Sequence, residues 1–498
     1  MELFSKFIIR PITKNILLTF ITEALVLGSF FFVYRLIAFD FGQDEVGQYS
    51  LIKRIITFLT PLLLLGFGIG LPRYLSLFPS TPKRAAYLQT GGAIALAATI
   101  IFSFVAEMNR AWFALVFFGS ETYANLIPPF LLLLVGMIFY GIIYAFLRGY
   151  LMVNTFNYFR IITIAILPIA VLILFSKSSI GFIIGLTGIA TIVLSLPFLF
   201  FLRKELIWRC SKKQLGEALK ELVGYSIPRM GGSFAFLGII SLGPILTAHF
   251  GLMRQVAYLS LSQNLLFAFA ALITPLGLIL LPKICNLMSQ KRDHEIKANI
   301  DFLIGAVIQG SIFITVQAII FSDLGIYFWL GPEFSAAVPI TQIVFSSALF
   351  YLFYAVVESI LDAVCAKPKN TVNLLISLIV FLTAIGLLVP IGWFSPAVSL
   401  AVAFSVAVVC LGSLSYISVR EIFPQQGHSD FFYFWTALSV NALLALAALA
   451  VKPLLIVNFY IWAIFEMILG IAYLAILWRL DMKWLKEFPG KIMLIKSK

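Results

Sequence analysis

Apolar runs of about twenty residues, divided by short polar segments, follow one another along the whole chain. A helix needs roughly 20 apolar residues to cross the hydrocarbon core of a bilayer, so each run predicts one membrane span. The pattern predicts an all-α membrane protein of about fourteen transmembrane helices, with no sizeable soluble domain. We place the spans at about 15–38, 49–71, 87–108, 125–147, 159–176, 180–202, 222–248, 256–281, 300–321, 337–363, 371–392, 396–418, 432–451 and 457–478.

The distribution of basic residues over the loops predicts how the helices are oriented in the membrane. Only 11% of the residues are charged, against about a quarter in soluble proteins. Counted over alternate loops, one side of the membrane collects 27 Lys and Arg residues and the other side four. Because cytoplasmic loops are enriched in basic residues, we predict a multi-pass inner (cytoplasmic) membrane protein with both termini in the cytoplasm. Arg148 and Arg160 are assigned to this bias alone. The net charge of +13 follows the loops and indicates no nucleic-acid partner.

The chain also carries a weak internal repeat with an offset of about 210 residues. The segments 41–73 and 250–283 both open with Phe-Gly and close with Leu-Pro and a basic residue. Farther on, Gly-Ser-Glu at 119–121 is echoed by Gly-Pro-Glu at 331–333. Six spans separate the copies, so both keep one orientation, as in transporters built from parallel repeats. The repeat predicts a V-shaped transporter with six-helix bundles at 1–210 and 211–422, and an additional helix pair with a basic tail at 423–498.

Three segments resemble a known family of transporters: DFGQDEVGQYSL at 40–51, GFGIGLPRY at 66–74 and YSIPRMGG at 225–232. They resemble bacterial polysaccharide (O-antigen) flippases. That family belongs to the multidrug/oligosaccharidyl-lipid/polysaccharide exporter superfamily, which also holds multidrug and toxin extrusion exporters and lipid II flippases. The resemblance implies a carrier that moves undecaprenyl-diphosphate-linked oligosaccharide to the outer leaflet by alternating access, in lipopolysaccharide or other polysaccharide biosynthesis. It implies membrane lipids and other polysaccharide assembly proteins as partners, and no cofactor.

Four basic residues within the predicted spans are candidate diphosphate-binding groups. Lys53 and Arg54 stand in the second span, and Arg229 lies in the seventh. Arg35 lies near the outer end of the first span. An ionisable group inside a span costs about 3 kcal/mol on insertion scales, so each needs a reason. These cations either line a cavity, where Arg grips a phosphate through two hydrogen bonds, or extend to the membrane surface.

The repeat distinguishes the two bundles. It places Gln263 and Asn264 where the first bundle has Lys53 and Arg54, and anchors at the membrane surface would not need to differ in this way. The difference favours a cavity that is positive on the first-bundle wall and neutral on the second. Pro228, with Gly231 and Gly232 about one turn later, predicts that the seventh helix is bent or broken beside that cavity.

Acidic residues within the spans are few. Glu23 belongs to a polar patch on the first helix. Tyr354, Glu358 and Asp362 share one polar stripe of the tenth helix, which predicts either a cavity face with a proton or cation site, or a satisfied helix–helix contact. The chain shows no metal-ligand spacing, nucleophile motif or nucleotide fingerprint, so we predict that it is not an enzyme.

Two other functions remain open at this stage. A multidrug or small-cation exporter of the same architecture would need acids near the middle of the membrane. The spans of the first bundle carry the acid Glu23 and the two cations Lys53 and Arg54, and this charge balance favours an anionic substrate. A membrane-embedded polysaccharide polymerase or glycosyltransferase would need a long external loop or a soluble domain. The predicted external loops, at about 109–124 and 322–336, are short and largely apolar.

Overall fold

A computed structural model of the protein describes residues 11–77, 81–289, 293–364, 368–424, 430–455 and 458–480. Within these ranges every regular element is a helix. The chain divides into two compact units, Met1–Ala257 (unit 1) and Tyr258–Lys498 (unit 2), and the boundary falls inside one helix. The predicted division at 210 and 422 describes the repeat and stays a prediction.

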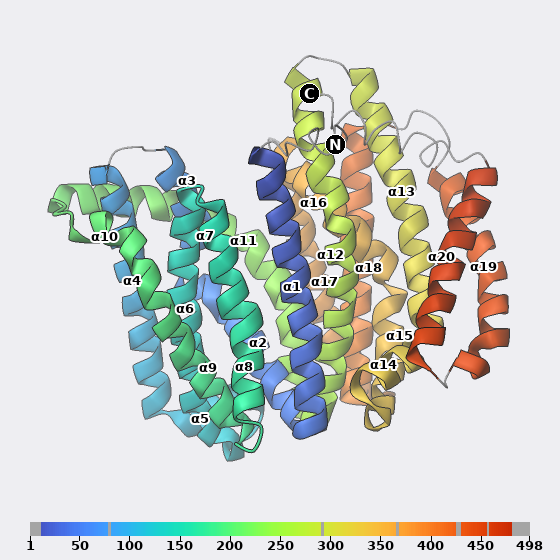
Figure 1. Ribbon diagram of the computed structural model, residues 1–498, viewed down its shortest axis with the longest axis horizontal. Coiled ribbons are helices and arrows are strands. Elements are labelled where there is room, and N and C mark those ends of the chain that lie inside the picture. The colour runs from blue at the N-terminus through green and yellow to red at the C-terminus, as the bar shows by residue number, and fades with distance from the viewer. Residues whose placement is uncertain are drawn as a thin grey trace, which may run out of the picture. The chain divides into compact units, whose positions relative to one another are not determined.

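Unit 1 is built around the apolar helix α6, which packs against α9, α3 and α4 (Figure 1). Helix α1 packs on α7 and α8, and α11 packs on α2 and α4. The long helices have these bounds: α1 Pro11–Asp40, α2 Gln43–Leu63, α3 Phe67–Leu77, α4 Thr81–Met108, α6 Ile127–Gly149, α9 Ile180–Ser195 and α11 Lys212–Phe250. The shorter elements are α5 Arg110–Phe118, η1 Glu121–Leu126, α7 Val153–Arg160, the π-helix η2 Ile161–Ile166, α8 Leu167–Leu174, η3 Leu196–Phe198 and α10 Leu199–Ile207.

Unit 2 contains most of α12 (Met253–Ser289) and all later helices. Helix α18 packs against α17, α16 and α15, and α13 packs against α16 and α19. The bounds are α13 Asp293–Ile320, α14 Ser322–Leu330, η4 Pro332–Ala337, α15 Val338–Ser346, α16 Ala348–Val364, α17 Lys369–Ile391, α18 Pro396–Ile422, α19 Asp430–Leu455 and α20 Phe459–Arg479.

The repeat inferred from sequence is present in the element bounds. Helices α2 and α12 begin 210 residues apart, and the short helices η1 and η4 begin 211 residues apart. Each 3₁₀ element follows a glycine with positive φ, Gly119 at 76° and Gly331 at 97°. Both copies therefore enter the 3₁₀ turn through a backbone conformation that glycine adopts without steric cost.

The described residues contain eleven helices long and apolar enough to cross a membrane, or thirteen if two bent helix pairs each count as one span. Helix α12 occupies the remaining predicted span at 256–281. We call the end of each unit that carries the basic loops its inner end, because the charge bias predicts that it faces the cytoplasm. The opposite end is the outer end.

Two spans predicted as continuous helices are broken. The second span is the pair α2 and α3, bent by 48°, and the tenth is the pair α15 and α16, bent by 53°. At the first break Leu65 has φ 47° and Gly66 has φ 69°. A Cβ atom on Gly66 would lie 2.7 Å from the side chain of Met230 in α11, so glycine at this position favours the close approach.

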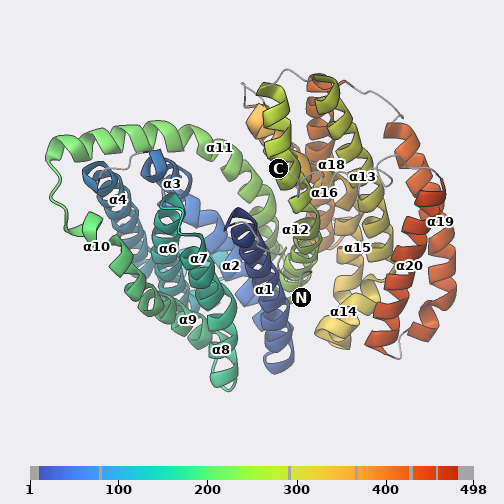
Figure 2. The ribbon, with the colours of Figure 1, turned by 45° about the horizontal axis from the view of Figure 1, so that its top comes forward.

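Helix α11 corrects one sequence expectation, a loop between the bundles, and confirms another, a bend in the seventh helix. The predicted loop between the bundles is largely helical, because α11 begins at Lys212, where Ser211 and Gln214 form a reciprocal capping box. The helix then runs through Pro228 to Phe250 as one bent element and is not broken (Figure 2). Its first part lies crosswise over the inner ends of α3 and α4, and its second part crosses unit 1.

The additional helix pair is fastened to the rest of unit 2 by charge near the ends of α19. Near the inner end, Arg420 of α18 binds Asp430 of α19 and Asp301 of α13, each at 2.5 Å. Near the outer end, Lys452 binds Asp323 at 2.8 Å and donates to the carbonyl oxygen of Ile320 at 2.6 Å.

Candidate functional site

Helix α2 carries the two cations that the sequence singled out. Lys53 is half-buried, whereas Arg54 is only 8% exposed. Successive residues of an α-helix point about 100° apart, so the two side chains leave α2 on different faces. They do not form a single clamp: Arg54 lies within the packing of unit 1, and Lys53 lies beside it on a more open face.

The face that carries Lys53 continues as a polar stripe. Thr57 is exposed and Thr60 is half-buried. Their hydroxyls donate to the carbonyl oxygens of Lys53 and Ile56, both at 2.7 Å, and each oxygen remains able to accept a further hydrogen bond. Within the described part of the chain, the ammonium group of Lys53 has no hydrogen-bond or ion-pair partner. The stripe thus offers one cation and two hydroxyls, and it ends at the break between α2 and α3.

Glu23 and Arg160 form an ion pair between α1 and α7. Both guanidinium Nη atoms contact the carboxylate, one of them at 2.8 Å. One helical turn away on each helix, Asn157 donates to the hydroxyl of Thr19 at 3.1 Å. The assignment of Arg160 to the charge bias alone is therefore wrong, because this residue has a specific partner. Sequence spacing could not reveal the pair, since its members lie 137 residues apart.

The other two predicted cations differ in what surrounds them. Arg35 is exposed, and its guanidinium lies 4.7 Å from the ring centroid of Phe39, one turn farther along α1. A cation–π pair near the outer end of a span is the arrangement of a membrane-surface anchor. The side chain of Arg229 lies outside the described residues, although α11 continues through this position.

The positions of unit 2 that the repeat aligns with Lys53 and Arg54 carry neutral side chains, Gln263 and Asn264. Gln263 is fully buried, and neither its amide nitrogen nor its amide oxygen has a partner among the described residues. Asn264 is half-buried. Beside them, the hydroxyls of Ser262 and Thr341 lie 2.8 Å apart and join α12 to α15. The half-buried ammonium of α2 is thus replaced in α12 by a buried neutral amide.

The polar stripe of the tenth helix begins inside unit 2 and ends near its surface. Tyr354 is 2% exposed and hydrogen-bonds to the carboxylate of Glu358, which is half-buried. Asp362 is exposed and accepts a hydrogen bond from Asn370 at 3.0 Å. The stripe therefore includes satisfied helix–helix contacts as well as a partly accessible acid, Glu358.

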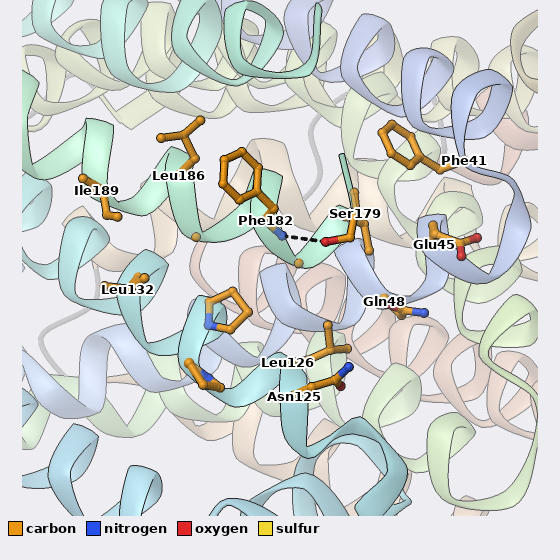
Figure 3. A pocket seen from close by; sticks show the side chains of 15 residues that line it. Phe41, Glu45, Gln48, Asn125, Leu126, Leu132, Ser179, Phe182, Leu186 and Ile189 are labelled. Carbon is orange, nitrogen blue, oxygen red and sulfur yellow. Dashed lines mark hydrogen bonds between the residues drawn. The ribbon is translucent and has the colours of Figure 1, made fainter. Parts of the chain in front are cut away.

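A cavity of about 530 Å³ opens at the outer end of unit 1 (Figure 3). Apolar side chains such as Leu132, Phe182 and Ile189 form most of its wall, and Glu45 and Gln48 add polar groups from α2. Lys53, Arg54 and Arg35 do not line this cavity. It is an apolar slot with a polar rim, separate from the stripe that carries Lys53.

The described residues include no group of His, Cys, Asp and Glu side chains that could hold a metal ion. Cys210 and Cys410 are free thiols, and the side chains of Cys285 and Cys365 lie outside the described residues. Burial raises the pKa of the Cys210 thiol.

The fold is that of polytopic transporters with two helical lobes. Neither a protein-family model nor a curated protein sequence matches this chain. Among solved structures, it is similar to the lipid II flippase MurJ in an inward closed conformation. That similarity has a TM-score of 0.71 and 15% identity, and covers 93% of this chain and 98% of the flippase.

The chain is also similar to an inward-facing multidrug resistance MATE family transporter of the MOP superfamily. Here the TM-score is 0.60 at 10% identity, over 80% of this chain and 94% of the transporter. At these identities the similarity establishes the fold. The predicted fold class, with its bundles of transmembrane helices, is thereby confirmed.

Proposed function

We propose that the protein is a flippase that moves an undecaprenyl-diphosphate-linked oligosaccharide from the cytoplasmic to the outer leaflet by alternating access. The fold shared with a lipid II flippase over 93% of the chain supports this proposal. So do the three flippase-like segments at 40–51, 66–74 and 225–232. The sugar part of the substrate is left unspecified, because no side chain described here distinguishes one sugar from another.

The charge balance of unit 1 carries the proposal. A cation exporter needs an acid that is available to its substrate, but the carboxylate of Glu23 is occupied by Arg160. Lys53, by contrast, keeps an ammonium group with no partner in the described part of the chain, beside the hydroxyls of Thr57 and Thr60. A half-buried cation attracts an anion more strongly than a fully hydrated one, because the lower local dielectric weakens screening. This arrangement suits a diphosphate.

We assign a separate role to each of the four predicted cations. We assign the contact with the diphosphate to Lys53, and Arg54 adds positive potential from its buried position one residue along. Arg229 stays in the proposal as a second phosphate-binding group. Arg35 serves as an anchor at the outer end, because its guanidinium is exposed and stacked on Phe39.

A flipping assay in vesicles tests the proposal. The protein is reconstituted with a fluorescent undecaprenyl-diphosphate oligosaccharide, and transfer between leaflets is measured by chemical quenching from outside. Lys53→Gln, which copies the residue of the second repeat, should slow transfer about 10–100-fold, the value of one hydrogen bond to a charged group. Lys53→Arg should retain most of the rate. Lys177→Gln removes the same charge from an exposed position on the outer side and should have no effect. Wild-type transfer by Lys53→Gln would refute the assignment.

A small-cation exporter is the second candidate, and Glu358 favours it. This half-buried carboxylate in unit 2 is accessible in part and is hydrogen-bonded to Tyr354. The same vesicles, loaded with a cationic dye, separate the two functions. Dye transport that Glu358→Gln abolishes and Lys53→Gln leaves intact, without lipid transfer, would establish the exporter.

A further inference from the structure

The edge of unit 1 formed by α10 and the first part of α11 gathers six exposed basic residues. We call it the α10–α11 edge. Glu217 and Glu221 are the exposed acids of the same segment, and none of the six cations forms an ion pair with a described acidic residue. The six are Arg203, Lys204, Arg209, Lys212, Lys213 and Lys220.

One side of this edge is firmly attached to unit 1. Ala218 and Leu222, one turn apart on α11, are buried against the inner ends of α3 and α4. In α10, Glu205 is 3% exposed and accepts a hydrogen bond from Tyr150. Burial and this hydrogen bond raise the pKa of Tyr150 to about 12, so its hydroxyl remains protonated and keeps Glu205 in place.

The other side presents apolar and basic groups together. Ile207 is 78% exposed and Trp208 is 45% exposed, next to the exposed Arg209. In α10 the guanidinium of Arg203 lies 3.9 Å from the ring centroid of Phe200. Aromatic and aliphatic side chains beside lysine and arginine characterise helices that lie in the headgroup region of a membrane.

Helix α11 has 39 residues, about twice the roughly 20 that a membrane span needs. The segment Met230–Phe250 is by itself long and apolar enough to cross a membrane, so the residues before it are not needed for the crossing. They run crosswise at the inner end, and α10 with the start of α11 forms the rim of unit 1 there (Figure 2). A basic segment at the membrane surface is attracted by anionic lipids, and each Lys or Arg contributes to the attraction.

We propose that the α10–α11 edge binds the headgroups of anionic phospholipids in the inner-end leaflet, and that this contact holds the crosswise part of α11 at the membrane surface. Unpaired cations supply the charge complementarity, and Ile207 and Trp208 enter the boundary between headgroups and acyl chains. Lys53 lies in α2, outside this edge, so the lipid site is separate from the position assigned to the diphosphate.

Lipid titration of the detergent-solubilised, full-length protein tests this proposal. Binding of phosphatidylglycerol and of phosphatidylcholine is measured by native mass spectrometry. The wild type should bind phosphatidylglycerol at least tenfold more tightly. The variant Lys212→Gln/Lys213→Gln/Lys220→Gln should lose that preference, and so should the wild type at high salt.

Two control variants keep the outcome interpretable. Lys177→Gln/Arg254→Gln removes two exposed cations from the outer side and should leave the preference intact. Lys53→Gln should also leave it intact, which separates this site from the proposed transport function. Equal binding of both lipids by the wild type, or an unchanged preference in the triple variant, would overturn the proposal. Melting curves show whether each variant is folded.

Discussion

Replacing Arg420 by glutamine should detach the inner end of the additional helix pair. The Arg420 side chain is 12% exposed, and its partners Asp301 and Asp430 are 14% and 8% exposed. Asp430 receives hydrogen bonds from both Nη2 and Nε, at 2.5 and 2.7 Å. One guanidinium therefore compensates two carboxylates that contribute to the contacts of α18 with α19 and α13.

The expected loss of folding stability follows from the two buried carboxylates that the substitution leaves without a cation. Removing one partner of a buried ion pair costs about 3–5 kcal/mol, because the remaining charge stays desolvated without compensation. Here two like charges remain close together, so the loss should fall in the upper part of that range unless one carboxyl group takes up a proton. In a unit of this size, each kcal/mol lost from the free energy of unfolding lowers the melting temperature by about 2–4 °C. We expect the melting temperature to fall by about 8–20 °C.

The assay is thermal unfolding in detergent, with hydrogen exchange to locate the change. Exchange should accelerate at the start of α19 and not in α2. Lys452→Gln is the matched control at the outer end, because its partner Asp323 is 44% exposed and such a pair contributes about 1 kcal/mol or less. Adding Asp301→Asn and Asp430→Asn to Arg420→Gln should restore much of the stability. If Arg420→Gln melts like the wild type, or the neutral triple variant melts no higher, the electrostatic explanation is wrong.

Two further predictions concern unit 1. Gly66→Ala should destabilise the protein by about 1–3 kcal/mol, since Gly66 has φ 69° and the new methyl group would meet a methionine of α11 at 2.7 Å. Gly68→Ala, where no atom lies within 4 Å, should be neutral or stabilising; melting curves in which the two variants coincide would contradict this. Burial raises the pKa of the Cys210 thiol, so less of it is thiolate near neutral pH than in an exposed cysteine. Maleimide should therefore modify Cys210 more slowly than a model thiol at pH 7.5, and the rate should increase as the pH rises; an equal rate would count against burial.

Local sequence pattern predicted the elements that depend on hydropathy. The apolar runs placed a helix in each predicted span, and the Phe-Gly and Gly-x-Glu signals located the repeat that α2 and α12 display. These features follow from the lipid environment, which requires continuous apolar helices. They also follow from glycine conformation, which is encoded locally.

What the sequence did not predict depends on contacts between distant segments. The break after α2 occurs at Leu65, a residue type that rarely adopts positive φ, and it lies where α11 approaches α2 and α3 closely. The pairs Arg160–Glu23 and Arg420–Asp301 each join residues more than a hundred positions apart. Lys53 is half-buried and Arg54 is buried because different neighbouring helices cover the two faces of α2. The hydropathy of the sequence does not show which helices these are.

The ion pair between α1 and α7 has a consequence for how the protein is made. Glu23 lies in the first span, and its partner Arg160 follows 137 residues later. At about 5–20 residues per second, ribosomes need roughly 7–27 s to synthesise that interval. During this time α1 holds an uncompensated acid near one end of its span, at a cost of up to about 3 kcal/mol. Its many leucine, isoleucine and phenylalanine side chains offset that cost until α7 arrives. The order of synthesis thus requires α1 to be apolar enough to remain inserted in the bilayer until α7 has been made.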